Sequence, residues 1–354
     1  MNDFTDLRQA VEALSSGANT VINDNIGMPS IVVPIPLMRY ANVIEGGTQE
    51  PLPGFLLSNV EQDVIYLSKY QNIVINDRAY SLPFKDPGVG IDFDTADRVS
   101  RNKGVGWHLQ TNALWAAIAL WCKRNGTLPR GNNNSGTDAQ TGESGILSEG
   151  GRTAGGSGPV SWYHNHHDTG IADLNGNVRE WCGGLRLMNG EIQIIPYGNA
   201  MRPDCDMSAN SGEWRAILPD GSLSPPGTPH TLKFDYTTAS MGPATPNFHL
   251  SEFLKHEQST NAEYGRRNFG ALEAAAGIDI PVLLQGLGIF PVDSGGYENQ
   301  GDFLFRNIGE RLPQRGGAFD NGNRAGVFGL SLTNTRTKTS ERIGFRAAYI
   351  QQKE

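Results

Sequence analysis

One segment near the C-terminal end, from Arg315 to Ala348, reads RGGAFDNGNRAGVFGLSLTNTRTKTSERIGFRAA. Glycines and large apolar residues alternate there with small polar ones, so that Leu330 and Leu332 should point to one side and Ser331 and Thr333 to the other. A period of two is typical of a half-buried strand. Small polar groups are adaptable hydrogen-bonding partners, as in antibody loops, and fit a binding surface better than a catalytic centre. A final hairpin with one polar face is the simpler alternative.

The composition bounds the class of protein. The chain has 354 residues, a formal net charge of −8 and 44 glycines, which is about 12% against a usual value of roughly 7% and indicates a folded, loop-rich protein. The negative charge gives no electrostatic footprint for nucleic acid. No run of about 20 apolar residues occurs, so we expect no membrane insertion. The N-terminal residues lack a signal-peptide pattern, which predicts synthesis in the cytoplasm.

Four segments are predicted to be helical: Asp3–Leu14, one or two turns at Thr95–Asn102, Thr111–Asn125 and a helix around Gly270–Ala276. The third has the strongest pattern, because a Thr or Asn can cap its start and a glycine follows its end. Its tryptophans are predicted to be core residues. Ile31–Leu37 is predicted to be a strand, placed at a sheet edge by its two prolines. Arg130–Pro159 is almost devoid of apolar residues and is predicted to be a long loop.

Four motifs occur in order along the chain. They are IYLSKYQNIV (Ile65–Val74), GWHLQTNALWAAIALWCKRNGTLPRGNNN (Gly106–Asn134), GIADLNGNVREW (Gly170–Trp181) and the closing RGG…IGFRAA of Arg315–Ala348. Together they resemble the variable proteins of diversity-generating retroelements. Those proteins are ligand binders with a C-type lectin fold, often receptor-binding proteins of phage tails. The motifs are also similar to the formylglycine-generating-enzyme (sulfatase-modifying factor) branch of that fold.

The resemblance implies an α+β protein with a C-type lectin fold, formylglycine-generating-enzyme-like, with long loop insertions. Residues 1–50 would form an N-terminal extension of one helix and one strand. Residues 51–354 would form the lectin-type domain, with the variable region at about 315–348. The Gly316–Gly317 and Ile343–Arg346 segments are expected to be adjacent strands, with Phe345, Leu330, Leu332 and Trp181 buried.

The resemblance also implies which side chains are diversified and displayed. Mutagenesis in these systems targets adenines, classically in Asn codons, and most small polar residues of the segment fit that origin, whereas Lys338 and Glu341 do not. The expected ligand-binding residues are Ala318, Asp320, Asn323, Arg324, Gly329, Ser331, Thr333, Thr337, Thr339, Ser340 and Arg342. We expect them to be largely exposed and to form one patch.

A structural calcium ion is a further expectation. In enzymes of this fold, the segment matching GIADLNGNVREW binds Ca²⁺ through a side chain, two backbone carbonyls and a carboxylate, which here are Asp173, Gly176, Val178 and Glu180. Oxygen donors in a flexible loop suit Ca²⁺. The alternative is a turn in which an asparagine bonds its own backbone and the tryptophan fills the core. The family usually has Trp where this chain has Arg179.

The cysteines argue against enzymatic activity and against a redox cofactor. Formylglycine-generating enzymes need a pair of cysteines near the closing strands, because a soft, redox-active metal requires thiolates. Arg315–Ala348 contains no cysteine, and the three in the chain are Cys122, Cys182 and Cys205. We therefore expect no enzyme.

The expected function is ligand binding in a phage or prophage tail, with a host surface protein or glycan as partner. A variable protein at the surface or in the cytoplasm of a bacterium is the second setting. An oxidoreductase acting on a cysteine-bearing protein and a purely structural virion protein are the alternatives from other classes. Either a monomer or a homo-oligomer such as a trimer is compatible with the sequence.

Overall fold

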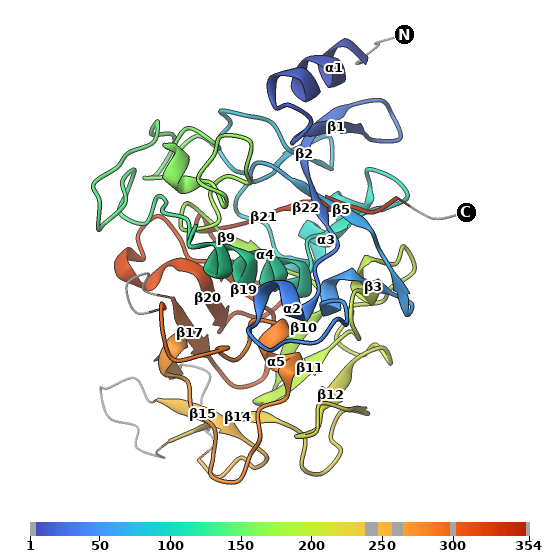
Figure 1. Cartoon of the computed structure of the whole chain (residues 1–354), viewed down its shortest axis with the longest axis vertical. Coiled ribbons are helices and arrows are strands. Elements are labelled where there is room, and N and C mark those ends of the chain that lie inside the picture. Colours follow the sequence, from blue (N-terminus) through green and yellow to red (C-terminus); the bar gives the residue numbers. More distant parts are fainter. Residues whose placement is uncertain (1–4, 238–246, 257–264, 298–301, 352–354) are drawn as a thin grey trace.

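The computed structural model describes residues 5–237, 247–256, 265–297 and 302–351. Many short strands and few helices make up this part of the chain, as expected for an α+β protein (Figure 1). The strands form three larger sheets and two small hairpins. The hairpins are β3–β4 (Leu56–Leu57 and Val60–Glu61) and β6–β7 (Ile73–Ile75 and Arg78–Tyr80).

The first sheet brings the two ends of the chain together. Its order is β1 (Thr20–Asn23), β2 (Pro29–Pro36), β5 (Val64–Ser68), β22 (Ala347–Tyr349) and β8 (Trp107–Leu109). The two strands of the first 50 residues therefore belong to the same sheet as the last strand.

The predicted strand Ile31–Leu37 corresponds to β2. The expectation that it lies at a sheet edge is wrong, because β1 pairs with it on one side and β5 on the other. β1 nevertheless pairs only with residues 29–32. The N–H of Leu37 donates to the carbonyl oxygen of Asp63, so the odd-numbered residues of this strand exchange hydrogen bonds with β5. The main-chain groups of Pro34 and Pro36 therefore point away from β5, to the side on which β1 lies. Because β1 pairs only with residues 29–32, no strand on that side needs an N–H from either proline.

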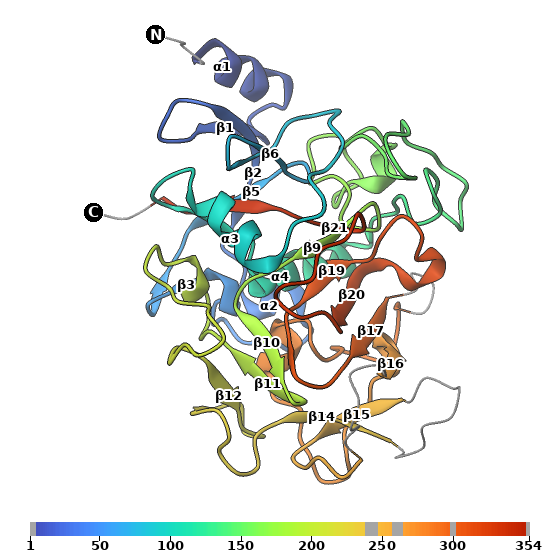
Figure 2. The same ribbon diagram turned by 180° about the vertical axis from the view of Figure 1, so that it is seen from behind.

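The second sheet contains the C-terminal segment. Its order is β16 (Gly265–Asn268), β17 (Phe303–Arg306), β20 (Gly326–Leu332), β19 (Gln314–Gly316), β9 (Arg179–Trp181) and β21 (Ile343–Phe345) (Figure 2). The RGG and GFR ends of the segment were expected to pair with each other. Instead β9 lies between them, antiparallel to β19 and parallel to β21.

The third sheet has the order β13 (Leu223–Ser224), β12 (Arg215–Ile217), β11 (Glu191–Ile194), β10 (Leu185–Met188) and β18 (Glu310–Arg311). Off this path, β14 (Lys233–Tyr236) pairs with both β11 and β15 (Phe248–Ser251). Short 3₁₀ helices occur at Pro53–Phe55, Val160–Trp162, Asn199–Met201, Phe269–Ala271 and Gly322–Arg324.

The α-helices are α1 (Thr5–Leu14), α2 (Tyr40–Val43), α3 (Phe93–Arg101), α4 (Asn112–Asn125) and α5 (Val282–Gly286). The first three predicted helices are confirmed as α1, α3 and α4, except that the first two residues of Asp3–Leu14 lie outside the described residues. The fourth is wrong, because only the 3₁₀ turn that ends at Ala271 forms there. The described residues 130–159 contain no helix or strand, as predicted.

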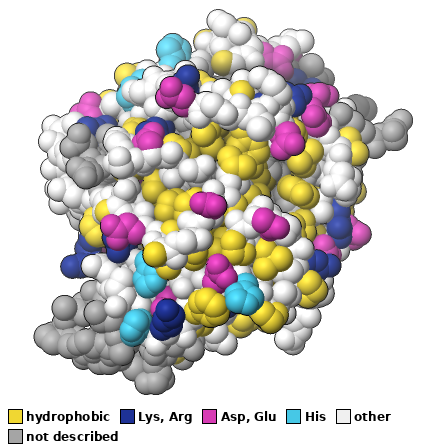
Figure 3. Space-filling model, turned by 60° about the horizontal axis from the view of Figure 1, so that its bottom comes forward, with side chains coloured by type: hydrophobic (Ala, Val, Ile, Leu, Met, Phe, Trp, Pro, Cys, Tyr) yellow, Lys and Arg dark blue, Asp and Glu magenta, His cyan; other side chains and the backbone are white. Residues whose placement is uncertain are grey.

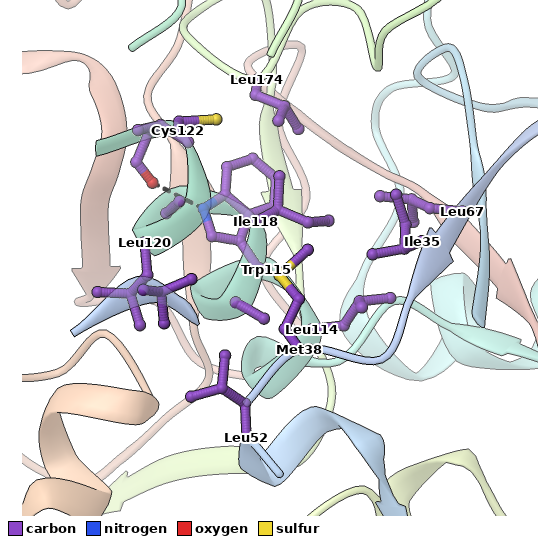
Figure 4. Close-up of a cluster of buried hydrophobic side chains, with 14 of the residues drawn as sticks. Ile35, Met38, Leu52, Leu67, Leu114, Trp115, Ile118, Leu120, Cys122 and Leu174 are labelled. Atoms are coloured by element: carbon purple, nitrogen blue, oxygen red, sulfur yellow. Dashed lines mark hydrogen bonds between the residues drawn. The ribbon is translucent and has the colours of Figure 1, made fainter. Parts of the chain in front are cut away.

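Helix α4 lies against the second sheet and forms the centre of one hydrophobic cluster (Figure 4). Both caps match the sequence pattern: the Thr111 side chain accepts a hydrogen bond from the N–H of Leu114, and Gly126 ends the helix with a φ of 69°. Trp115 is buried, and its indole N–H donates to the carbonyl oxygen of Val327 on β20 at 2.7 Å. This bond fixes the position of the helix relative to the strand.

The described residues contain no helix that is both long and apolar enough to cross a membrane. On the face shown in Figure 3, hydrophobic side chains gather near the centre, and acidic and basic side chains are scattered among them.

Candidate functional site

Two arginines of the closing segment are buried inside the protein and hold the frame together. The Arg315 guanidinium donates to the side-chain oxygen of Asn112, through Nε at 2.9 Å and Nη2 at 2.7 Å, and to the carbonyl oxygens of Leu287 and Gly288. It thereby connects β19 to the start of α4 and the end of α5. Burial lowers the pKa of Arg315 to about 10.

Arg346 has the same role at the other end of the segment. Its guanidinium forms a bidentate ion pair with Glu180, Nε to Oε2 at 2.9 Å and Nη2 to Oε1 at 2.8 Å, and both side chains are fully buried. It also donates to the carbonyl oxygens of Ser68, Lys69 and Ala172. Phe345, Leu330, Leu332 and Trp181 are buried as predicted.

The residues expected to bind calcium do not fit a calcium ion. Both oxygens of Glu180 accept from Arg346, and one also accepts from the side-chain amide of Gln71 at 3.0 Å. The same amide nitrogen lies 3.1 Å from the carbonyl oxygen of Val178 and 3.3 Å from that of Asp173. A neutral N–H donor therefore lies where the oxygens would have to converge on a cation, which needs six to eight of them.

The Asp173 side chain is also engaged, since its Oδ2 accepts from the N–H of Gly156 at 2.7 Å. Burial raises the pKa of this carboxyl to about 6, although that hydrogen bond and the charge of Arg346 act in the opposite direction. The expected calcium site is therefore corrected to a buried hydrogen-bond network. Within residues 5–237 and the other described ranges, no group of three or more His, Cys, Asp or Glu side chains could hold a metal.

The alternative interpretation, a turn, holds in part. Trp181 fills the core and its indole N–H donates to the carbonyl oxygen of Ile91. Asn177, however, bonds across the structure and not to its own backbone. Its side-chain oxygen accepts from the N–H of Thr153, and its amide nitrogen donates to Gln71 and to the carbonyl oxygen of Thr153. This asparagine anchors the long 130–159 loop.

The predicted ligand-binding residues fall into three classes of exposure. Asp320, Asn323, Arg324, Thr337, Thr339 and Arg342 are exposed, Thr333 and Ser340 are half-buried, and Ala318, Gly329 and Ser331 are buried. The expectation of exposure is therefore wrong for the last three.

The reason is that every residue of β20 is buried, so the alternation of residue types does not correspond to an exposed face. The strand lies inside the sheet, between β17 and β19. Gly329 is packed so closely that a Cβ atom would lie 2.9 Å from the carbonyl oxygen of Gly326, nearer than such contacts are found. A larger residue at this position requires the backbone to shift. Ala318 is 0% exposed, in the turn that Asn321 closes.

Beyond the buried part of β20, side chains from four segments surround a hollow of about 210 Å³. The lining residues are Arg179 of β9, Phe305 of β17, Asn321 and Arg324 of the 320–324 turn, and Ser331 and Thr333 at the end of β20. The hydroxyls of Ser331 and Thr333 lie 2.9 Å apart. Three predicted binding residues therefore meet here.

Two arginines give the hollow positive charge. The Nε and Nη2 of Arg179 both donate to the side-chain oxygen of Asn321, at 3.3 and 3.0 Å, so the guanidinium is held in place. Burial lowers the pKa of Arg179; Asp320 acts in the opposite direction, and Arg342 and Arg324 lower it further. Arg324 is exposed and takes part in no ion pair with another described residue.

A second, very small cavity shares five of these lining residues and is also lined by Phe303, Gln314 and Gly329. Gln314 lies opposite Ser331 in the β19–β20 ladder and is 1% exposed. Its side-chain oxygen accepts from Asn334, but its amide nitrogen has no hydrogen-bond partner among the described residues. An unpaired buried donor costs about 1–3 kcal/mol, which a ligand oxygen could offset.

Sequence reasoning missed Arg179, Phe305 and Gln314, which lie outside the predicted surface. One signal was present: Arg179 stands where the family that the motifs resemble usually has Trp. For Phe305 and Gln314 no local signal exists, because strand pairing brings them to the hollow.

The exposed run at 335–342 forms a loop beside this hollow, and one ion pair joins the two regions. Arg342 pairs with Asp320 through its Nη2 at 2.6 Å. Arg336 anchors the loop by pairing with Glu310 at 2.9 Å and with Asp94. Thr337 and Thr339 therefore lie on a fixed loop beyond the hollow.

A larger cavity of about 670 Å³ lies between β2, α4 and residues 164–169. Val33, Ile118, Trp121 and His164 are among its lining residues, and no predicted binding residue is. Size alone does not make it the binding site, because the predicted surface lies around β20.

Comparisons with known proteins add little. No protein-family model matches the sequence, and no curated protein matches it. Among solved structures, Treponema denticola variable protein 1 is similar at a TM-score of 0.34 and 10% identity, over 94% of this chain and 99% of that chain. PvdO from Pseudomonas aeruginosa is similar at a TM-score of 0.27 and 10% identity, over 94% and 98% of the two chains. Both TM-scores are low, so neither likeness establishes a common fold.

Proposed function

We propose that this chain is a ligand-binding protein whose binding surface is the hollow and the exposed side chains around it. The surface comprises Asp320, Asn323, Arg324, Thr333, Thr337, Thr339, Ser340 and Arg342, with Ser331 at the floor of the hollow. One observation supports this proposal most strongly. The strands and the buried side chains of Arg315 and Arg346 fix the backbone of the segments that carry these residues. Their side chains can therefore vary while the fold persists.

The finer assignment is also a proposal. We infer a C-type lectin fold of the formylglycine-generating-enzyme branch, diversified by a retroelement, in a phage or prophage tail that binds a host surface protein or glycan. The four ordered sequence motifs support it. A variable protein of the bacterial surface or cytoplasm is the second setting. We propose no calcium role, because Gln71 and Arg346 occupy the donor atoms.

The decisive experiment is a pooled library in which only the exposed and half-buried positions vary, while Ala318, Gly329 and Ser331 are kept. Folding is scored by protease resistance and binding by retention on host cells. We expect most members to fold and partner choice to change among them, because a few contacts decide specificity. A matched library at exposed positions away from the hollow, such as Arg124 and Val105, should leave partner choice unchanged.

Two outcomes separate the alternatives. If folded members all retain the parental partner, the surface is not the recognition site and a structural virion protein becomes the better assignment. If the purified chain converts a cysteine-bearing peptide, the oxidoreductase alternative is restored.

A further inference from the structure

The charged groups that line the hollow beside β20 are hydrogen-bond donors, and the acceptors there are neutral oxygens such as those of Asn321, Ser331 and Thr333. Arg179 and Arg324 contribute guanidinium N–H groups, and Gln314, which lines the small cavity that shares five residues with the hollow, contributes a buried amide N–H that has no described partner. No Asp or Glu is among the described residues that line it. Asp320, which is adjacent to Asn321 in the sequence, is paired with Arg342 at 2.6 Å. A site of this kind matches a ligand that brings its own acceptors and a negative charge.

The arrangement of the donors favours a carboxylate. Guanidinium groups match a planar carboxylate through two parallel hydrogen bonds. Arg179 is held in place because its Nε and Nη2 donate to Asn321, which orients the N–H groups of Nη1 and the second N–H of Nη2 before a ligand arrives. Preorganised donors lose less conformational entropy on binding, which strengthens the interaction. Arg324 is an exposed lining residue of the hollow and offers the ligand a second guanidinium.

The remaining walls favour a sugar ring as the carrier of that carboxylate. Phe303 and Phe305 stack on each other with ring centroids 6.0 Å apart and an angle of 29° between the planes, and both are half-buried. They give one wall an apolar face. Ser331, the neighbour of Phe305 in the β17–β20 ladder, and Thr333 place two hydroxyls beside this apolar face. A pyranose ring has apolar C–H faces and hydroxyl edges, and therefore matches both kinds of wall.

From these contacts we propose that the hollow binds the carboxylate of an acidic monosaccharide unit, such as a uronic acid, on the host ligand. This inference rests on the proposed ligand-binding function and adds the chemical class of the ligand. It gives Arg179, a residue outside the variable segment, a binding role that every diversified variant would retain. Diversified residues around the hollow would then select the context in which the acidic sugar occurs.

The test uses the full chain and saturation-transfer NMR with glucuronate, and with glucose as the neutral match. We expect glucuronate to bind more tightly than glucose. Arg324→Gln should weaken glucuronate binding about tenfold or more, the usual effect of losing a hydrogen bond to a charged group, and leave glucose unchanged. Arg124→Gln removes the same charge from an exposed arginine that does not line the hollow, and should leave both sugars unchanged.

Gln314→Met gives a readout that a purely structural role would not give. It should weaken glucuronate binding with little change in the melting temperature, because the variant removes a buried unpaired donor together with the one hydrogen bond that half-buried Asn334 donates to Gln314, and nearly keeps the volume. The proposal is overturned if both sugars bind equally, if Arg124→Gln and Arg324→Gln weaken binding equally, or if N-acetylglutamate, a surrogate for an acidic peptide, binds more tightly than glucuronate.

The outcome is separable from that of the library experiment. If the library changes partner choice but glucuronate does not bind, the surface recognises ligands of another class. If glucuronate binds as expected but the library leaves partner choice unchanged, the hollow binds acidic sugars without being the diversified recognition site.

Discussion

Residues 170–181 and residues 318–342 are both rich in polar side chains, and the sequence assigned a binding role to each. The structure gives them opposite environments. In the first, the side chains of Asp173, Asn177 and Glu180 are 2% exposed or less and have partners within the protein. In the second, most polar side chains face solvent or line the hollow. Polar residues thus indicate a site only where the protein leaves them without internal partners.

The largest expected effect is a loss of stability caused by a substitution in residues 170–181, where the polar side chains are buried. Glu180→Ala should reduce the free energy of unfolding by about 3–5 kcal/mol, because it leaves the fully buried Arg346 without its counter-charge. Urea titration monitored by circular dichroism measures the change. Asp320→Ala, which breaks an ion pair of exposed Arg342, is the matched control and should cost no more than about 1 kcal/mol. Equal losses in the two variants would mean that the two regions do not differ.

The second expected effect is a pH dependence of the free energy of unfolding, caused by the buried Asp173 in residues 170–181. The pKa of Asp173 is raised by burial to about 6, so between the unfolded value of about 4 and about 6 the folded state binds more protons than the unfolded state. Stability should therefore fall as pH rises through that window, by on the order of 3 kcal/mol from this group, and then level off.

Asp173→Asn tests that assignment. Asn tolerates the positive φ of 61° at this position and does not ionise. Unfolding free energies measured from pH 4 to pH 7 should show a flatter profile than the wild type. An unchanged slope would assign the dependence to another group.

The third expected effect is a small change in the free energy of unfolding when exposed side chains of residues 318–342 are replaced. Asn323→Ala and Thr337→Ala should each change the free energy of unfolding by no more than about 0.5 kcal/mol, as exposed positions usually do. Gly329→Ala, at a buried position of β20, should be more damaging because its Cβ would lie 2.9 Å from the carbonyl oxygen of Gly326. Chemical denaturation of the three variants compares them directly, and a large loss at Asn323 or Thr337 would place that residue in the frame.

The smallest expected effect is the response to calcium. The melting temperature should be the same in millimolar Ca²⁺ and in excess chelator, because the oxygens of Glu180 and Val178 are bonded to Arg346 and Gln71. An ion that bound the folded state at 100 times its Kd would contribute about 2.7 kcal/mol. A rise in melting temperature that Asp173→Asn removes would restore the calcium site.

Local sequence patterns predicted the structure correctly wherever the residues of a single segment determine it. Helix α4 and both of its caps follow from Thr111, its apolar stripe and Gly126. The burial of Leu330, Leu332 and Phe345 follows from their apolar character. Residues 130–159 form a long loop because they contain almost no apolar side chains.

Only the tertiary structure decided which polar side chains form the site. Strand order places β9 between β19 and β21 and so brings Arg179 beside Asn321 and Arg324. It also buries both faces of β20 and puts Gln314 opposite Ser331. Gln71 reaches Glu180 across more than a hundred residues. Such contacts depend on register and packing between distant segments, and no local periodicity encodes them.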